Sequence, residues 1–218
     1  MKRNWKELLL RIVILLVGLT IAHLGVALFY LTFLGTDPFN VLVDGVFRTI
    51  SSNFPALTWF STGWTWFFLC LLIVLILLIV DRTYIKIGTV VCMAFGGFIL
   101  DFFKGLLGDV ITDSLPYAVR LSLLAAGCII LAYGMTIVIK SDAGTGPNDL
   151  VSIAISDKAH FRFGITRVVT DFLFVLIGFL LGGKVGEGTV VCAFLVGFVA
   201  EWFLPLNGKI VDKILSKS

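Results

Sequence analysis

One sequence pattern occurs twice in this chain. Gly88-Thr-Val-Val-Cys92 returns one hundred residues later as Gly188-Thr-Val-Val-Cys192, and half of the positions are identical between residues 88–103 and 188–203. A second set of residues agrees at a spacing of 109: Arg11, Gly18, Gly25, Gly35, Thr36 and Pro38 match Arg120, Gly127, Gly134, Gly144, Thr145 and Pro147. Such self-similarity indicates two related halves.

The composition indicates a membrane protein. Of the 218 residues, 59% are hydrophobic and 14% are charged, and the mean hydropathy is +1.06. Soluble domains have about half apolar and about a quarter charged residues. A helix that crosses a bilayer needs about 20 apolar residues, and six segments qualify: 12–34, 63–80, 86–106, 117–139, 164–182 and 188–206. We therefore predict an all-α membrane protein with six transmembrane helices.

Three spans in each half would make the halves inverted relative to each other. We expect repeat one over residues 1–107 and repeat two over 117–218, together forming one membrane domain. Cytoplasmic loops carry an excess of lysine and arginine, so an inside N-terminus gives both termini a cytoplasmic position. Thirteen basic residues then lie on the cytoplasmic side: Lys2, Arg3, Lys6, Arg11, Arg82, Lys86, Lys140, Lys158, Arg162, Arg167, Lys209, Lys213 and Lys217. The other side has four: Arg48, Lys104, Arg120 and Lys184.

A short helix is predicted after the first span of each half, over 38–50 and 147–157. Pro38 and Pro147 suit the first helical position, with Asp37 or Gly146 as the cap. The helices are either re-entrant, with their N-termini aimed at a solute in the interior, or amphipathic and interfacial. The predicted substrate-binding residues are Thr36, Asp37, Asn40, Asp44, Thr145, Asn148, Asp149 and Ser152. The charge of Asp37 weakens an anion site, which leaves a cation or zwitterion open.

Four ionisable residues inside the spans are candidates for ion coupling, because such groups are costly in a bilayer. Asp101 and Glu201 occupy matching positions, and the alternative for Asp101 is an interfacial pair with Lys104. Asp171 has no counterpart in the repeat, and the alternative for it is an ion pair with Arg167 near the cytoplasmic end. His23 is either a proton relay or a side chain bonded to a neighbouring helix.

Other chemistries lack their motifs. The four cysteines lie in apolar stretches without Cys-x-x-Cys spacing, and there are two histidines, so we predict no metal and no cofactor. Neither Gly-x-Ser-x-Gly nor His-Glu-x-x-His occurs, which argues against an enzyme. A net charge of +3 without a basic run gives no surface for nucleic acid.

The chain resembles the YczE/YyaS/YitT family of bacterial integral membrane proteins. The resemblance rests on residues 35–42, 144–150 and 182–189, and on Gly197 followed by Glu201. Asp37 departs from it, because a small residue is more usual there. The resemblance implies a multi-pass protein of the bacterial inner membrane and supplies no settled activity or site.

The inverted repeat favours a small-solute secondary transporter or exporter with its site between the two halves. One alternative is a substrate-binding subunit, similar to the S-components of ABC-type vitamin uptake complexes, and another is a non-transporting membrane scaffold. The expected partners are the lipid bilayer and an unidentified small polar or charged solute. A homo-oligomer is compatible with the sequence.

Overall fold

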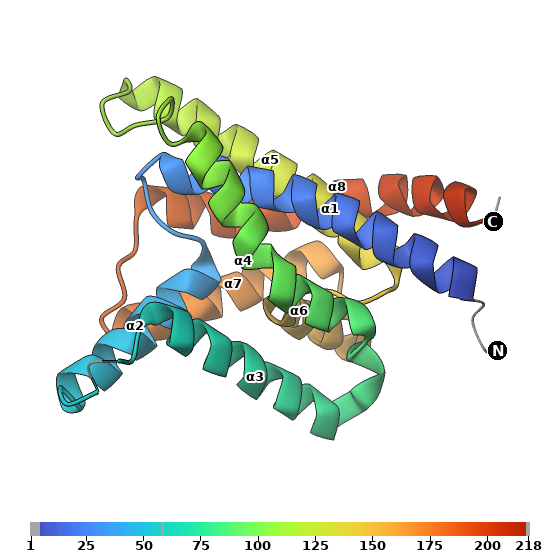
Figure 1. Ribbon diagram of the computed structural model, residues 1–218, viewed down its shortest axis with the longest axis horizontal. Coiled ribbons are helices and arrows are strands. Elements are labelled where there is room, and N and C mark those ends of the chain that lie inside the picture. The colour runs from blue at the N-terminus through green and yellow to red at the C-terminus, as the bar shows by residue number, and fades with distance from the viewer. Residues whose placement is uncertain (1–4, 58, 217–218) are drawn as a thin grey trace.

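The computed structural model describes residues 5–57 and 59–216, and this part of the chain is helical without a strand (Figure 1). Its elements are α1 (Trp5–Leu31), α2 (Pro38–Asn53), α3 (Thr62–Asp81), the short 3-10 helix η1 (Arg82–Tyr84), α4 (Ile87–Leu107), α5 (Tyr117–Ser141), α6 (Pro147–Ala159), α7 (Phe163–Leu180) and α8 (Glu187–Leu215). Lys2, Arg3 and Lys217 of the predicted cytoplasmic charges lie outside the described residues.

Six helices are long and apolar enough to cross a membrane: α1, α3 with η1, α4, α5, α7 and α8. The six predicted spans and the two short helices are therefore confirmed as helices. The largest differences are at the ends of the chain, because α1 begins at Trp5 and α8 continues through Pro205 to Leu215. An ion pair one turn apart, between Glu7 and Arg11 at 2.9 Å, stabilises the added turns of α1.

The outer surface of the helices is apolar. Ile79, Phe98 and Leu180 are each more than 70% exposed, on three different predicted spans. A continuous apolar surface of this kind is rare on soluble monomers. It suits contact with lipid.

Helices α1 and α5 cross at glycines and lie side by side (Figure 1). A Cβ atom on Gly18 would lie 2.9 Å from the carbonyl oxygen of Gly134, and one on Gly134 would lie 2.6 Å from that of Gly18. Gly25 and Gly127 approach each other in the same reciprocal way. Gly18, the first of these glycines in α1, meets Gly134, the second in α5. The two helices therefore run antiparallel.

Matching residues of the two halves make matching contacts. Arg11 donates to the carbonyl oxygen of Ser141 at 2.9 Å, and Arg120 donates to that of Thr32 at 2.7 Å. Ser141 is the last residue of α5, and Thr32 directly follows α1. Each arginine thus binds the C-terminal end of the other half's first helix, where free carbonyl oxygens carry partial negative charge.

A second reciprocal pair joins the loops to the last helix of each half. The N–H of Gly88 donates to Ala143 at 2.8 Å, and the N–H of Gly188 donates to Leu34 at 2.9 Å. Gly88 and Gly188 lie at opposite ends of the antiparallel α1–α5 pair. We call these ends the Lys86 end and the Lys184 end. The first turn of α1 and the last turn of α8 both lie at the Lys86 end (Figure 1).

Candidate functional site

The two short helices begin as the sequence predicts. Pro38 and Pro147 occupy the first turn of α2 and α6, and the caps are Asp37 and Gly146. The side chain of Asp37 accepts from the backbone N–H of Asn40 at 3.2 Å and also from its side-chain amide. Figure 1 shows the connection after α1 turning back along the molecule before α2 begins. The start of α2 is therefore displaced from the end of α1 toward the interior.

An arginine and three carboxylates gather near these helix starts. Arg167 of α7 donates to Asp149 in the first turn of α6 and, at 2.9 Å, to Asp171 one turn along α7. Arg167 also attracts Asp37, and the charges of Asp37 and Asp149 both act on Asp171. The side chains of Arg167 and Asp171 are 9% and 1% exposed. We call these four residues the central charged cluster.

The cluster lies deep in the molecule. Asp171 is the ninth of the 18 residues of α7, so the predicted ion pair with Arg167 is confirmed, but its predicted position near the cytoplasmic end is wrong. Arg167 is likewise buried within α7, not among the surface charges with which the sequence analysis counted it. The charge of Asp149 also acts on His23 of α1, Cys70 of α3 and Cys92 of α4, all in the first half of the chain. Residues of both halves therefore surround the cluster.

The charges in the cluster do not balance, because three carboxylates share one guanidinium group. One carboxylate oxygen of Asp171, Oδ1, is buried and has no hydrogen-bond partner in the part of the chain that the structure describes. Burial raises the pKa of Asp37, which lies between α1 and α2 outside the six spans, although its bonds to Asn40 and the charge of Arg167 oppose this shift. A buried excess of negative charge is stabilised by a proton or a bound cation. The arrangement suits a cation and disfavours an anion.

Several predicted binding residues lie beside the cluster or support it. Asn40 bonds to Asp37, and the amide of Asn148 donates to Asp149 at 3.0 Å. Ser152 is fully buried on α6, and its hydroxyl has no partner within the described residues. Asp44 lies elsewhere, since its carboxylate accepts from Arg48 at 2.8 Å and from the backbone N–H of Lys184 at 3.0 Å.

The matched acids Asp101 and Glu201 make local contacts. Asp101 is 78% exposed and lies 3.7 Å from Lys104, as the interfacial alternative predicts. Glu201 accepts from Arg162 at 3.0 Å and from the backbone N–H of Gly164 at 2.7 Å, at the start of α7. It therefore satisfies a free N–H group of the first helical turn.

His23 bonds within its own helix. Its Nδ1 lies 2.8 Å from the carbonyl oxygen of Leu19, which assigns the proton of the neutral ring to Nδ1. The other ring nitrogen faces Gly96 of α4, where a Cβ atom would lie 2.9 Å from it. The close approach of α1 and α4 at this point depends on the missing side chain of Gly96.

Replacing Glu201 by alanine is expected to lower the free energy of unfolding by about 1 kcal/mol, the usual value of a helix cap. The reason is that Gly164 and Arg162 both lose their acceptor. Denaturant titration of the purified protein in detergent measures the change. Asp101→Ala is the matched control and should change stability little, because its carboxylate is exposed. Equal losses in both variants would contradict the cap.

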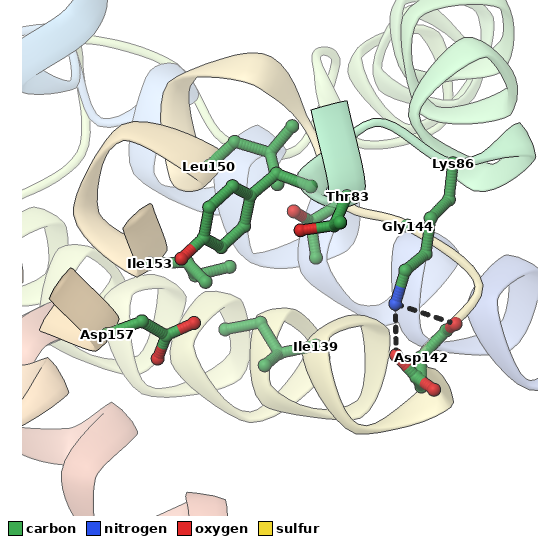
Figure 2. Close-up of a pocket in the computed structure, with 10 residues that line it drawn as sticks. Thr83, Lys86, Ile139, Asp142, Gly144, Leu150, Ile153 and Asp157 are labelled. Carbon is green, nitrogen blue, oxygen red and sulfur yellow. Dashed lines mark hydrogen bonds and ion pairs between the residues drawn. The ribbon is translucent and has the colours of Figure 1, made fainter. Parts of the chain in front are cut away.

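A cavity of about 410 Å³ opens at the Lys86 end (Figure 2). Its wall comes from η1, the end of α5 and α6: Thr83, Tyr84, Lys86, Ile139, Asp142, Gly144, Thr145, Leu150, Ile153 and Asp157. Figure 2 shows Lys86 reaching across to Asp142, with which it forms an ion pair. The hydroxyl of Thr145 is buried there without a hydrogen-bond partner in the described part of the chain. Thr145 lies just before α6, and Leu150, Ile153 and Asp157 place one face of α6 along the cavity. We call it the Lys86-end pocket.

Sequence reasoning missed two features of this region. Arg167 was considered as a cytoplasmic charge and as a partner of Asp171, whereas its bond to Asp149 joins α6 to α7. The threonine of the repeated Gly-Thr also has a structural role, because Thr189 donates to the carbonyl oxygen of Thr36 at 2.6 Å. The repeat itself carried the signal for Thr189, since Thr89 and Thr189 match.

Comparisons with known proteins find relatives along most of the chain. An "Uncharacterized protein" of Haemophilus influenzae is 26% identical over 206 residues, covering 94% of this chain and 88% of the relative. "Uncharacterized protein YyaS" of Bacillus subtilis is 24% identical over 193 residues, covering 87% and 90%. "Uncharacterized membrane protein YczE" of the same organism is 24% identical over 136 residues, covering 62% and 61%.

The relatives confirm the resemblance to YczE and YyaS. No solved structure matches the chain. The family model described as "Family of unknown function (DUF6198)" matches residues 9–205. With its six membrane-length helices, the chain is therefore a membrane protein that belongs to this family.

Proposed function

We propose that the chain is a small-solute secondary transporter of the bacterial inner membrane, with its solute site at the central charged cluster. The observation that carries this proposal is that the buried Asp171 and the half-buried Asp149 share the guanidinium of the buried Arg167, whose charge also acts on the half-buried Asp37. Ionisable groups at this depth are costly and mark solute or ion pathways.

Two inverted three-helix repeats form the framework of the proposed transporter. The antiparallel crossing of α1 and α5 supports the inversion, as do the exchanged contacts of Arg11 and Arg120. The charge bias assigns the Lys86 end, with both termini, to the cytoplasm. Transporters of this kind bind their solute where broken helices meet near the middle of the membrane.

The short helices α2 and α6 are the re-entrant elements of the proposal. Phe39, Val41 and Val43 of α2 are each at most 3% exposed, as is Leu150 of α6. A helix that lay flat at the membrane surface would leave one face in water. The burial of these residues favours re-entrant helices.

The proposed solute is a small cation, either an inorganic monovalent ion or a primary amine. Its positive charge would replace the missing partner of Asp171 Oδ1. A proton released from Asp37 or Asp171 on binding would couple solute movement to a pH gradient. Asp171 thus takes the coupling role in the proposal, and Asp101 and Glu201 do not.

The test is flux into liposomes that contain a pH-sensitive dye. The purified protein is reconstituted and challenged with monovalent cations and small primary amines, one at a time. Asp171→Asn keeps the size of the side chain and removes its charge, so we expect flux to fall at least about tenfold, the effect of one lost charged contact. Asp101→Asn is the matched control, and its flux should stay unchanged because the carboxylate is exposed. Absence of flux and of any thermal shift over the whole panel would contradict transport.

A further inference from the structure

The Lys86-end pocket has a counterpart region at the other end of the molecule. The spacing of 109 residues matches Thr145, Ile153 and Asp157 of the pocket with Thr36, Asp44 and Arg48. The spacing of 100 residues matches Tyr84 with Lys184. The two regions are therefore built from corresponding parts of the two halves.

Direct contacts close the counterpart region at the Lys184 end. Asp44 accepts from the backbone N–H of Lys184 at 3.0 Å, at positions that match Ile153 and Tyr84 of the pocket. Thr49 of α2 donates to the carbonyl oxygen of Leu181 at 3.1 Å. The backbones of α2 and α7 also meet, since a Cβ atom on Gly178 would lie 2.5 Å from the carbonyl oxygen of Val41.

The two threonines of the repeated Gly-Thr, Thr89 and Thr189, differ in the hydrogen bonds of their hydroxyl groups. Thr189 donates to the carbonyl oxygen of Thr36 at 2.6 Å and accepts from the backbone N–H of Gly186 at 3.3 Å. Its counterpart Thr89 is 1% exposed, and its hydroxyl has no hydrogen-bond partner among the described residues. The hydroxyl of Thr145, the counterpart of Thr36, is also buried without a partner and lines the pocket.

A buried hydroxyl without a partner costs free energy. A state in which the Thr89 hydroxyl gains a bond and the Thr189 hydroxyl loses one would therefore have a similar free energy. The backbone bonds Gly88–Ala143 and Gly188–Leu34 are present at both ends. The side-chain bond of the threonine is present at the Lys184 end, whereas the hydroxyl of Thr89 has no partner among the described residues.

We propose that the structure holds one of two access states, open through the Lys86-end pocket and closed at the Lys184 end by the bond from Thr189 to Thr36. In the other state Thr89 donates to the carbonyl oxygen of Thr145, the pocket closes, and Thr189 releases Thr36. This inference rests on the proposed transport function. The pocket is then the entrance for the small cation, and the two threonines are its gates.

The test measures the access of a membrane-impermeant maleimide from each face of the membrane, without any solute. Leu150→Cys reports on the pocket and Val41→Cys, at the matching position, reports on the other end. The four native cysteines, all buried, are replaced by alanine. With both threonines present, Cys at 150 should react from the Lys86 face, and Cys at 41 should react slowly from the Lys184 face.

The gate variants should act in opposite directions. Thr189→Val removes a bond of this state, so labelling at position 41 should rise about fivefold, the effect of one hydrogen bond. Thr89→Val removes a bond of the other state only, so labelling at position 41 should fall. Thr189→Ser and Thr89→Ser keep the hydroxyl and should behave like the parent.

Changes in the same direction, or equal labelling in all variants, would overturn the gate. Flux in the liposome assay would then still support transport. Opposite changes without flux for any solute would leave the two access states standing and would contradict the transport function. Monodisperse elution of each variant in detergent checks its folding.

Discussion

Replacing Arg167 by leucine is expected to lower the free energy of unfolding by about 3–5 kcal/mol, the cost of removing one partner from a buried ion pair. Leucine leaves the carboxylates of Asp149 and Asp171 in the interior without the guanidinium that binds both. Chemical denaturation in detergent or bicelles measures the loss. Arg162→Leu is the matched control, because Arg162 is 72% exposed and its pair with Glu201 should contribute less than about 1 kcal/mol.

A second variant identifies the cause of that loss. Adding Asp149→Asn and Asp171→Asn to Arg167→Leu removes the uncompensated charges while keeping the size of both side chains. Stability should then recover by more than half. If the triple variant is as unstable as Arg167→Leu, the loss comes from the packing of the arginine chain, and the interpretation of the cluster as a charged site is wrong.

The main elements of the fold were predictable because they rest on local signals. Apolar length predicted six spans, and Pro38 and Pro147 marked the starts of α2 and α6 to the residue. These signals act within one or two helical turns. The ends of α1 and α8 were not found, since their outer turns are polar and stay helical without an apolar signal.

The candidate site was predictable only in part, because it depends on contacts between segments that are distant along the chain. The importance of Asp37 and Asp149 followed from their places at helix starts. That Arg167 joins Asp149, 18 residues away, required knowing which faces of α6 and α7 meet. Asp44 was included in the predicted site because it is a polar residue in the second turn of α2. Its carboxylate instead accepts from the backbone N–H of Lys184 at the Lys184 end.

The two halves share a framework and differ in their charges. At a spacing of 101, Asp171 of α7 corresponds to Cys70 of α3, and at the spacing of 109, Asp37 corresponds to Gly146. The glycines and the Gly-Thr pairs, which set the crossing and the loop contacts, are kept in both halves. The repeat therefore explains the architecture. The residues that depart from it, which include two acids of the central charged cluster, are the better guide to the proposed solute.

The crossing of α1 and α5 gives the second large effect. A Cβ atom on Gly134 would meet backbone atoms, including the carbonyl oxygen of Gly18 at 2.6 Å. Backbone atoms cannot rotate away as a flexible side chain can, so the two helices must move apart. Because Gly25 and Gly127 make the same close approach, the movement disturbs the whole contact between the halves.

Gly134→Ala is therefore expected to lower the free energy of unfolding by about 3 kcal/mol, at the upper end of overpacking effects. Gly97→Ala is the matched control, because no described residue outside the adjoining backbone of α4 has an atom within 4 Å of the added Cβ atom. That control should be neutral or stabilising by up to about 1 kcal/mol, since alanine favours a helix. Thermal unfolding of both variants in the same detergent measures the difference. If Gly134→Ala is as stable as Gly97→Ala, the α1–α5 crossing does not hold the two halves together.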